Sequence, residues 1–183
     1  MKSSGNRSKK KTVSKSIALV GIMAAAIECG KLALSFIPNV EVVTLFIALF
    51  SYVFGLSGIL AAFVFVCIEP LIWGFGTWIA SYIIYWPAVA LVFFFLGSLK
   101  IRNRFVISFI VALSTFIFGI LTSLIDVGLL SGFLDNFWYR FSIYYARGAV
   151  FYIVHIISNT IIFLALFNFL RIKLEEIKKQ LYP

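Results

Sequence analysis

The sequence predicts an all-α membrane protein with six transmembrane helices and with both termini in the cytoplasm. Of its 183 residues, 62% are hydrophobic and only 13% are charged, against about 45–50% and about 25% in ordinary soluble domains. The mean hydropathy is +1.06, and about 20 apolar residues cross a bilayer as a helix. A chain of this size filled with spans has no room for a separate catalytic or nucleotide-binding domain. Any ATP-driven step must therefore come from a partner.

Basic residues orient the chain. Six of the 16 Lys and Arg lie in the first fifteen residues, with no acid among them. A basic segment beside an apolar one marks a cytoplasmic end by the positive-inside rule. We therefore expect residues 1–15 to form a cytoplasmic tail, and residues 171–183, with four further basic residues, to form another. Nucleic-acid binding is the competing interpretation of a basic tail, but here no basic fold follows it.

Four helices are expected before the next basic cluster. The first is predicted at 16–37, where Pro38 ends the apolar run. Residues 40–99 carry only two charged groups, Glu41 and Glu69. This length holds three spans of about 20 residues. Glycine-rich breaks divide it into helices at 42–54, 59–73 and 77–99. The first two are short for a full crossing, so we expect them to be tilted or to continue into their turns.

The number of crossings agrees with the positions of the basic residues. After four spans the chain returns to the cytoplasm, where it places Lys100, Arg102 and Arg104. The remainder forms the fifth helix, an outer segment and the sixth helix, at 105–130, 131–144 and 145–170. The transmembrane domain therefore covers residues 16–170.

Polar residues gather toward the outer surface under this topology. An ionised group at membrane depth costs about 2.5–3.5 kcal/mol on insertion scales, so it normally faces a partner, a cavity or water. We therefore expect several helices to direct polar groups into one outward-facing cavity that binds a small molecule. The candidate substrate-binding residues are Glu28, Lys31, Asn39, Glu41, Glu69, Asp126, Arg147, His155 and Asn159, with an aromatic face of Trp78, Tyr82 and Trp86.

Each candidate also has a purely structural interpretation. Glu28 and Lys31 are three residues apart and can neutralise each other on one helix face. Glu69 precedes Pro70 and can bond to backbone that a kink frees. His155 alone is more often a packing residue than a ligand, and outer aromatic residues often form an interfacial belt. The shared depth of the polar residues is the observation that favours a site.

The first helix carries two stripes of small residues, which permit close approach of another helix. The first consists of Ala18, Gly21 and Ala25, and the second of Ala26, Gly30 and Ala33. Internal packing explains one stripe. Two stripes on different faces indicate that this helix also meets a helix from another chain.

The sequence predicts neither an enzyme nor a metal site. One His and two Cys cannot make a usual zinc site, and the glycine and Ser/Thr pattern of a phosphate-binding loop is missing. A chain of acids through both leaflets, as in an ion-coupled transporter, is missing as well. We therefore expect no catalytic residue, no cofactor and no metal.

Together these features resemble the substrate-binding membrane subunits (S components) of energy-coupling factor (ECF) vitamin importers. The resemblance covers essentially the whole chain: small size, six spans, both ends inside, a basic N-terminus and a small-residue motif in the first helix. In that family the motif, usually two alanines four residues apart, contacts the transmembrane coupling subunit, and Gly21 and Ala25 occupy the matching positions here. The resemblance implies a bacterial cytoplasmic membrane protein that captures a vitamin or its precursor from outside. It also implies two ATPase subunits that drive the coupling subunit.

Short stretches look most like the S components linked to cobalamin: residues 38–41, Gly74-Phe75-Gly76, Trp86-Pro87 and His155-x-x-x-Asn159. Cobalamin is therefore the expected ligand within this resemblance. The alternative from a different class is a membrane scaffold, whose polar outer face meets another membrane protein without transport of a small molecule. An enzyme embedded in the bilayer comes third.

Overall fold

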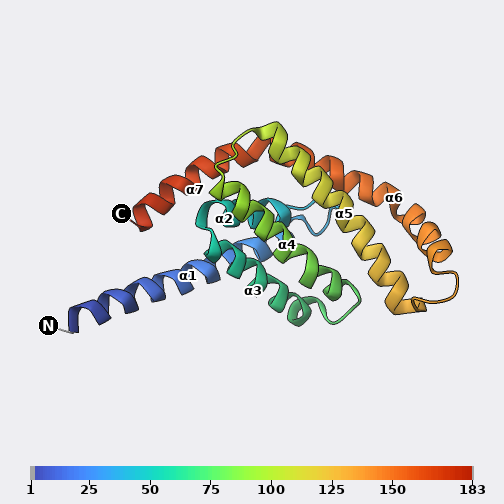
Figure 1. Cartoon of the computed structure of the whole chain (residues 1–183), viewed down its shortest axis with the longest axis horizontal. Helices are drawn as coiled ribbons and strands as arrows, with labels where there is room; N and C mark the ends of the chain where they lie inside the picture. The colour runs from blue at the N-terminus through green and yellow to red at the C-terminus, as the bar shows by residue number, and fades with distance from the viewer. Residues whose placement is uncertain (1–2, 183) are drawn as a thin grey trace.

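In the computed structural model the backbone is described for residues 3–182 and side chains are described from Val13 to Tyr182. Most of the basic side chains of the predicted 1–15 tail lie outside the described residues. Every element between residues 3 and 182 is helical (Figure 1). The elements are α1 (Ser3–Leu34), α2 (Val43–Phe54), α3 (Leu56–Trp73), α4 (Trp78–Ser98), α5 (Arg104–Ser131), α6 (Phe137–Ile162), the π-helical turn η1 (Phe163–Phe167) and α7 (Asn168–Leu181).

Five helical stretches are long and apolar enough to cross a membrane, which indicates a multi-pass membrane protein. They are Val13–Leu34, Leu56–Trp73, Trp78–Ser98, Arg104–Ser131 and Phe137–Leu181. The remaining helix, α2, has only 12 residues, and its length of about 18 Å is well below the hydrocarbon thickness of about 30 Å. The all-helical, membrane-type fold class is thus confirmed for the described residues.

Both ends of the chain are more helical than predicted. The first helix was expected at 16–37, but α1 spans Ser3–Leu34 and so includes most of the predicted 1–15 tail. The C-terminal third differs as well. The segment 131–144 was expected to be an outer connection, but α6 already begins at Phe137. Its first turns are held by stacked rings four residues apart, Phe137 on Phe141 and Phe141 on Tyr145. Beyond residue 170 the helix continues as α7, in which ion pairs at helical spacing join Arg171 to Glu175 and Lys173 to Glu176. The predicted tail at 171–183 is therefore largely helical.

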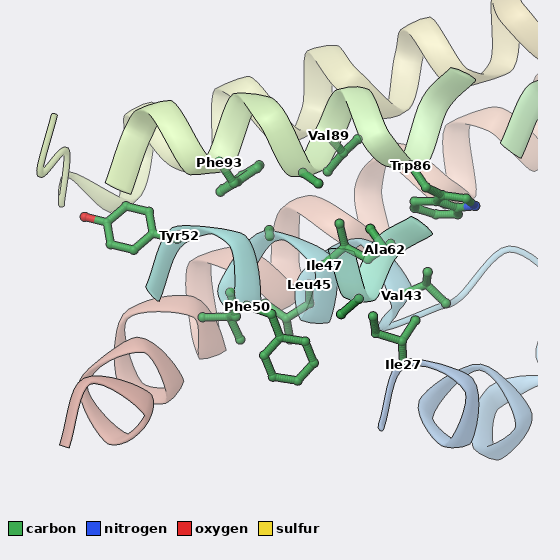
Figure 2. Packing of buried hydrophobic residues seen from close by; sticks show 14 of the residues in the cluster. Ile27, Val43, Leu45, Ile47, Phe50, Tyr52, Ala62, Trp86, Val89 and Phe93 are labelled. Atoms are coloured by element: carbon green, nitrogen blue, oxygen red, sulfur yellow. The ribbon is translucent and has the colours of Figure 1, made fainter. Parts of the chain in front are cut away.

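The short helix α2 forms the centre of the molecule. Ten of its twelve residues are buried, and it contacts α1, α3, α4, α6 and α7. Figure 2 shows its side chains packed among Ile27 of α1, Ala62 of α3 and Phe93 of α4. An apolar helix surrounded on all sides is expected at the core of a bundle, and here it provides the platform for the loop that precedes it.

Two glycines allow α2 to pack so closely. Gly55 adopts a φ of +64°, which disfavours a side chain, and it alone turns α2 into α3. The predicted break at 55–58 is therefore a single residue. At the other crossing, a Cβ on Gly97 of α4 would overlap the backbone carbonyl of Tyr52 in α2. The helices thus pack backbone to backbone, as small residues permit in membrane bundles.

The two ends of the bundle differ in chemistry. One end, the cavity end, carries the α1–α2 loop (35–42) and the turns 74–77 and 132–136, and a hydrogen bond from Thr77 to Asp126 joins α4 to α5 there. The opposite end, the basic end, carries the turn 99–103 and α7, joined to α2 by Tyr52 Oη donating to Ile101 O at 3.0 Å and Lys178 Nζ donating to Val53 O at 2.6 Å. A pocket at the basic end is lined by Lys100, Arg102, Lys178 and Lys179 with Glu175.

Candidate functional site

A cavity of about 490 Å³ opens at the cavity end, between the α1–α2 loop and the adjoining ends of α1, α3 and α4. Small-molecule sites usually enclose about 300–1,000 Å³ and combine aromatic walls with a few convergent polar groups. Five of the predicted site residues line this cavity: Lys31, Asn39, Glu41, Trp78 and Tyr82. Trp73, which was not among the predicted site residues, is a further wall.

Glu41 is the most extensively hydrogen-bonded carboxylate of the site. It accepts from the backbone N–H of Thr44 at 2.8 Å and from the Thr44 hydroxyl at 2.5 Å, and so satisfies one of the free N–H groups at the start of α2. From α6, Asn159 Nδ2 donates to it at 2.8 Å and His155 Nε2 lies 3.2 Å away. Three predicted site residues therefore meet at one point.

The α1–α2 loop is fastened to α6 at a second point. Asn39 adopts a φ of +58°, a conformation that Asn tolerates better than most residues, and its carbonyl accepts from Ser158 Oγ at 3.1 Å. Asn159 also donates to Thr115 Oγ1 of α5 at 3.3 Å. Sequence analysis missed Thr44, Thr115 and Ser158. Only Thr44 had a signal, because it follows Glu41 by three residues at the start of the predicted helix 42–54, where free backbone N–H groups need acceptors.

The surroundings of Glu41 lower the pKa of its carboxyl below the ordinary value of 4.5. Burial acts in the opposite direction and is the largest single influence, but the hydrogen bond and charge of His155 and the hydrogen bonds from Thr44 outweigh it together. The ionised carboxylate is therefore the form that the folded site holds.

A lowered pKa makes a contribution to stability that depends on pH. The contribution is fully present above the unfolded pKa of about 4.5 and is lost as the pH falls through the folded pKa below it. We expect wild type to melt above Glu41→Gln at pH 6, and the difference to shrink as the pH is lowered toward 3. Thermal unfolding of both proteins across this range measures it. A difference that stays constant with pH would show that Glu41 is not held ionised by its partners.

Lys31 is enclosed by aromatic rings and paired with a buried acid. Its ammonium forms an ion pair with Glu69 of α3 and lies 4.9 to 6.0 Å from four ring centroids, within cation–π range. These rings, here called the aromatic cage, belong to Phe65, Trp73, Trp78 and Tyr82. Glu28 accepts from Trp73 Nε1 at 3.4 Å instead of pairing with Lys31. The structural interpretation in which these two neighbours neutralise each other is therefore not the observed one.

Seven predicted site residues do not line this cavity. Four of them, Glu28, Glu69, His155 and Asn159, are buried and contact residues that do line it. The other three are Asp126, Arg147 and Trp86. Asp126 accepts from Thr77 and Tyr144 and, with Arg147, lines a separate pocket of about 240 Å³ on α5 and α6. Trp86 is only 3% exposed and packs edge-on against Tyr82 within α4. The expectation of one cavity for all candidates is thus corrected. Residues at equal depth were assigned to one site, but Asp126 and Arg147 line a pocket formed by α5 and α6, and Trp86 is buried inside the bundle.

The two small-residue stripes of α1 face different surroundings. Ala18, Gly21 and Ala25 are exposed, and a Cβ on Gly21 would meet nothing within 4 Å. In the second stripe, a Cβ on Gly30 would come within 2.7 Å of Phe46 of α2. Gly30 of the second stripe therefore serves internal packing, whereas Ala33 of the same stripe is exposed, and the first stripe is a free face of small side chains.

No group of three or more His, Cys, Asp or Glu side chains within the described part of the chain is placed to hold a metal ion. No family model, curated protein or solved structure matches the chain. Function is therefore inferred from the geometry and charges of the cavity.

Proposed function

We propose that this protein is the membrane-embedded substrate-binding subunit of an ECF-type importer, which captures a vitamin-like small molecule at the cavity end. The observation that carries the proposal is the cavity itself, about 490 Å³ with Trp73, Trp78 and Tyr82 on one side and Lys31, Asn39 and Glu41 on the other. Flat apolar walls with a few fixed polar groups are the usual composition of a small-molecule site. A scaffold needs no such hollow.

The proposed topology has six spans, with the cavity end outside and both termini in the cytoplasm of a bacterial cell. In this topology α2 is the short second span, and the loop 35–42 leads into it from the outer surface, where it lines the cavity. The basic turn 99–103 and α7 then face the cytoplasm, in accordance with the positive-inside rule.

Two exposed turn residues with matching backbone conformation test this topology. Lys100 has a φ of +55° at the basic end and Asn136 a φ of +53° at the cavity end. In a Cys29→Ala, Cys67→Ala background, we expect a membrane-impermeant maleimide applied to intact cells to label Asn136→Cys and to spare Lys100→Cys until the cells are opened. Labelling of Lys100→Cys in intact cells would show that the protein has the opposite orientation in the membrane.

The exposed stripe of Ala18, Gly21 and Ala25 is the proposed contact for the coupling subunit. Its small side chains permit the close helix approach that such contacts need, and Gly21 leaves open space above it. The ATPase subunits act through that partner.

A cavity of about 490 Å³ favours a ligand no larger than the drug-sized molecules that such pockets enclose. Cobalamin, with a macrocycle and a nucleotide arm, is larger, so the loop 35–42 must move outward to admit it.

Ligand-dependent melting of the purified chain tests the proposal. We expect one member of a panel of water-soluble vitamins, cobalamin included, to raise the melting temperature of the chain without partners. At a ligand concentration of about 100 Kd, binding adds about 2.7 kcal/mol. If no vitamin shifts melting and none co-purifies, the scaffold alternative replaces the importer.

A further inference from the structure

The Lys31 ammonium lies among aromatic rings, in surroundings that are unusual for a protein's own side chain. Four rings surround it at 4.9 to 6.0 Å from their centroids, and Trp73, Trp78 and Tyr82 are at the same time walls of the cavity. Aromatic cages of this kind are the usual recognition elements for ammonium groups of ligands. Lys31 therefore occupies a site with the chemistry of a cation-binding site.

Lys31 forms an ion pair with only one of the two buried acids at this position, Glu69. Glu28 is 8% exposed and Glu69 is fully buried, yet Oε2 of Glu28 and Oε1 of Glu69 have no hydrogen-bond partner. Glu41 adds a third carboxylate on the cavity wall, shared with His155. Buried polar groups are normally hydrogen-bonded, so the free oxygens of Glu28 and Glu69 lack a donor.

A ligand that brings a positive charge and hydrogen-bond donors can pair with both acids, whereas an anion places a further acceptor beside them. The Lys31 side chain is 22% exposed and carries its ammonium on a flexible stem. The ammonium can therefore leave the aromatic cage without movement of the backbone. The vacated position then offers four ring faces and the carboxylates of Glu69 and Glu28. The remaining walls, Trp73, Trp78 and Tyr82, offer flat apolar surface to a ring.

We propose that the cavity binds an organic cation that carries a flat ring, and that the charge of this ligand takes the position held by the Lys31 ammonium in the empty site. Lys31 is thus a tethered occupant that neutralises Glu69 until the ligand replaces it. The inference rests on the proposed function and names the substrate class of that site.

Three small probes of similar size and different charge test the inference: benzyltrimethylammonium, benzamide and benzoate. Each is titrated into the purified full chain at pH 7, and binding is followed by the fluorescence of the tryptophans, of which Trp73 and Trp78 line the cavity. We expect the cation to bind at least tenfold more tightly than the neutral and anionic probes. Tighter binding of benzoate would overturn the inference and leave small-molecule capture intact.

Substitution of Lys31 gives opposite results for a cationic and an anionic ligand. Lys31→Met removes the tethered competitor, so benzyltrimethylammonium should bind about tenfold more tightly and should restore thermal stability that the variant loses. If Lys31 instead holds an anion, the same change abolishes benzoate binding and gives the cation no advantage. Lys173→Met on α7, where the side chain is 57% exposed, is the matched control and should change neither titration.

A double variant covers the case in which Lys31→Met alone does not fold. Lys31→Met with Glu69→Gln removes the ion pair as a unit and avoids an unpaired buried charge. It should bind the cation at least tenfold less tightly than wild type, because Glu69 holds the charge. Cation binding equal to wild type overturns the inference. Failure of every probe and every vitamin overturns both it and the proposed function.

Discussion

Replacement of Glu41 by alanine should abolish ligand capture and lower thermal stability together. The change leaves Asn159 Nδ2 and the N–H of Thr44 without their acceptor at 2.8 Å, and a buried polar group left unsatisfied costs about 1–3 kcal/mol. It also removes one of the two points at which the α1–α2 loop is fastened to α6, and the bond from Ser158 to Asn39 remains. We expect a loss of about 3 kcal/mol or more in unfolding free energy and at least a 100-fold weaker vitamin affinity, measured by titrated unfolding and by ligand-dependent melting.

Glu176→Ala is the control for this prediction. Glu176 pairs with Lys173 at the basic end, and both side chains are more than half exposed, so the pair contributes little. That variant should unfold and bind as wild type does. A Glu41→Ala protein that keeps wild-type stability and affinity would show that the hydrogen bonds of Glu41 do not organise the site.

Gly97→Val should prevent α4 from packing on α2. A Cβ at residue 97 overlaps the backbone of Tyr52, which cannot move aside as a side chain end could. The buried face of α2 would separate from α4, and forced insertion of bulk into a packed interior costs about 1–3 kcal/mol or more. We expect little folded protein after extraction in mild detergent, as judged by size-exclusion chromatography.

Gly21→Val is the same substitution on a free face and provides the matched control. A Cβ at Gly21 has no neighbour within 4 Å, so this variant should fold and bind ligand normally. It should weaken assembly with the coupling subunit, because the branched side chain holds the partner helix away. Equal recovery of both variants would contradict the backbone-to-backbone packing of α2 and α4.

Most of the helical arrangement follows from patterns in the sequence. Apolar length locates the membrane-type helices, and glycines locate the turns at 55 and 74–76. The start of α6 was missed because the aromatic segment 137–145 was interpreted as interfacial, whereas its rings stack at helical spacing. The continuation into α7 was missed because charge was interpreted as the end of a span, although the i, i+4 pair of Arg171 and Glu175 supports a helix.

The sequence predicted how deep in the membrane the candidate site residues lie, but not which neighbouring helix each of them faces. Positions along the predicted spans placed Lys31, Glu41 and Glu69 near one surface, and the structure brings Lys31 to Glu69 across α1 and α3. Periodicity along one helix cannot say which neighbour it faces, so Glu28 was considered as the partner of Lys31. For the same reason Asp126 was assigned to the wrong pocket.

The central claim is that the cavity end holds one small molecule, and native mass spectrometry of the purified chain tests it most directly. Val40 lines the cavity, so Val40→Trp places a large ring inside it. Leu71→Trp is the control, because it adds the same ring at a surface position where Leu71 is 79% exposed. With the vitamin that raises melting, wild type and Leu71→Trp should each carry one bound molecule, and Val40→Trp should carry none. A bound molecule retained by folded Val40→Trp, or none on wild type, would contradict the claim.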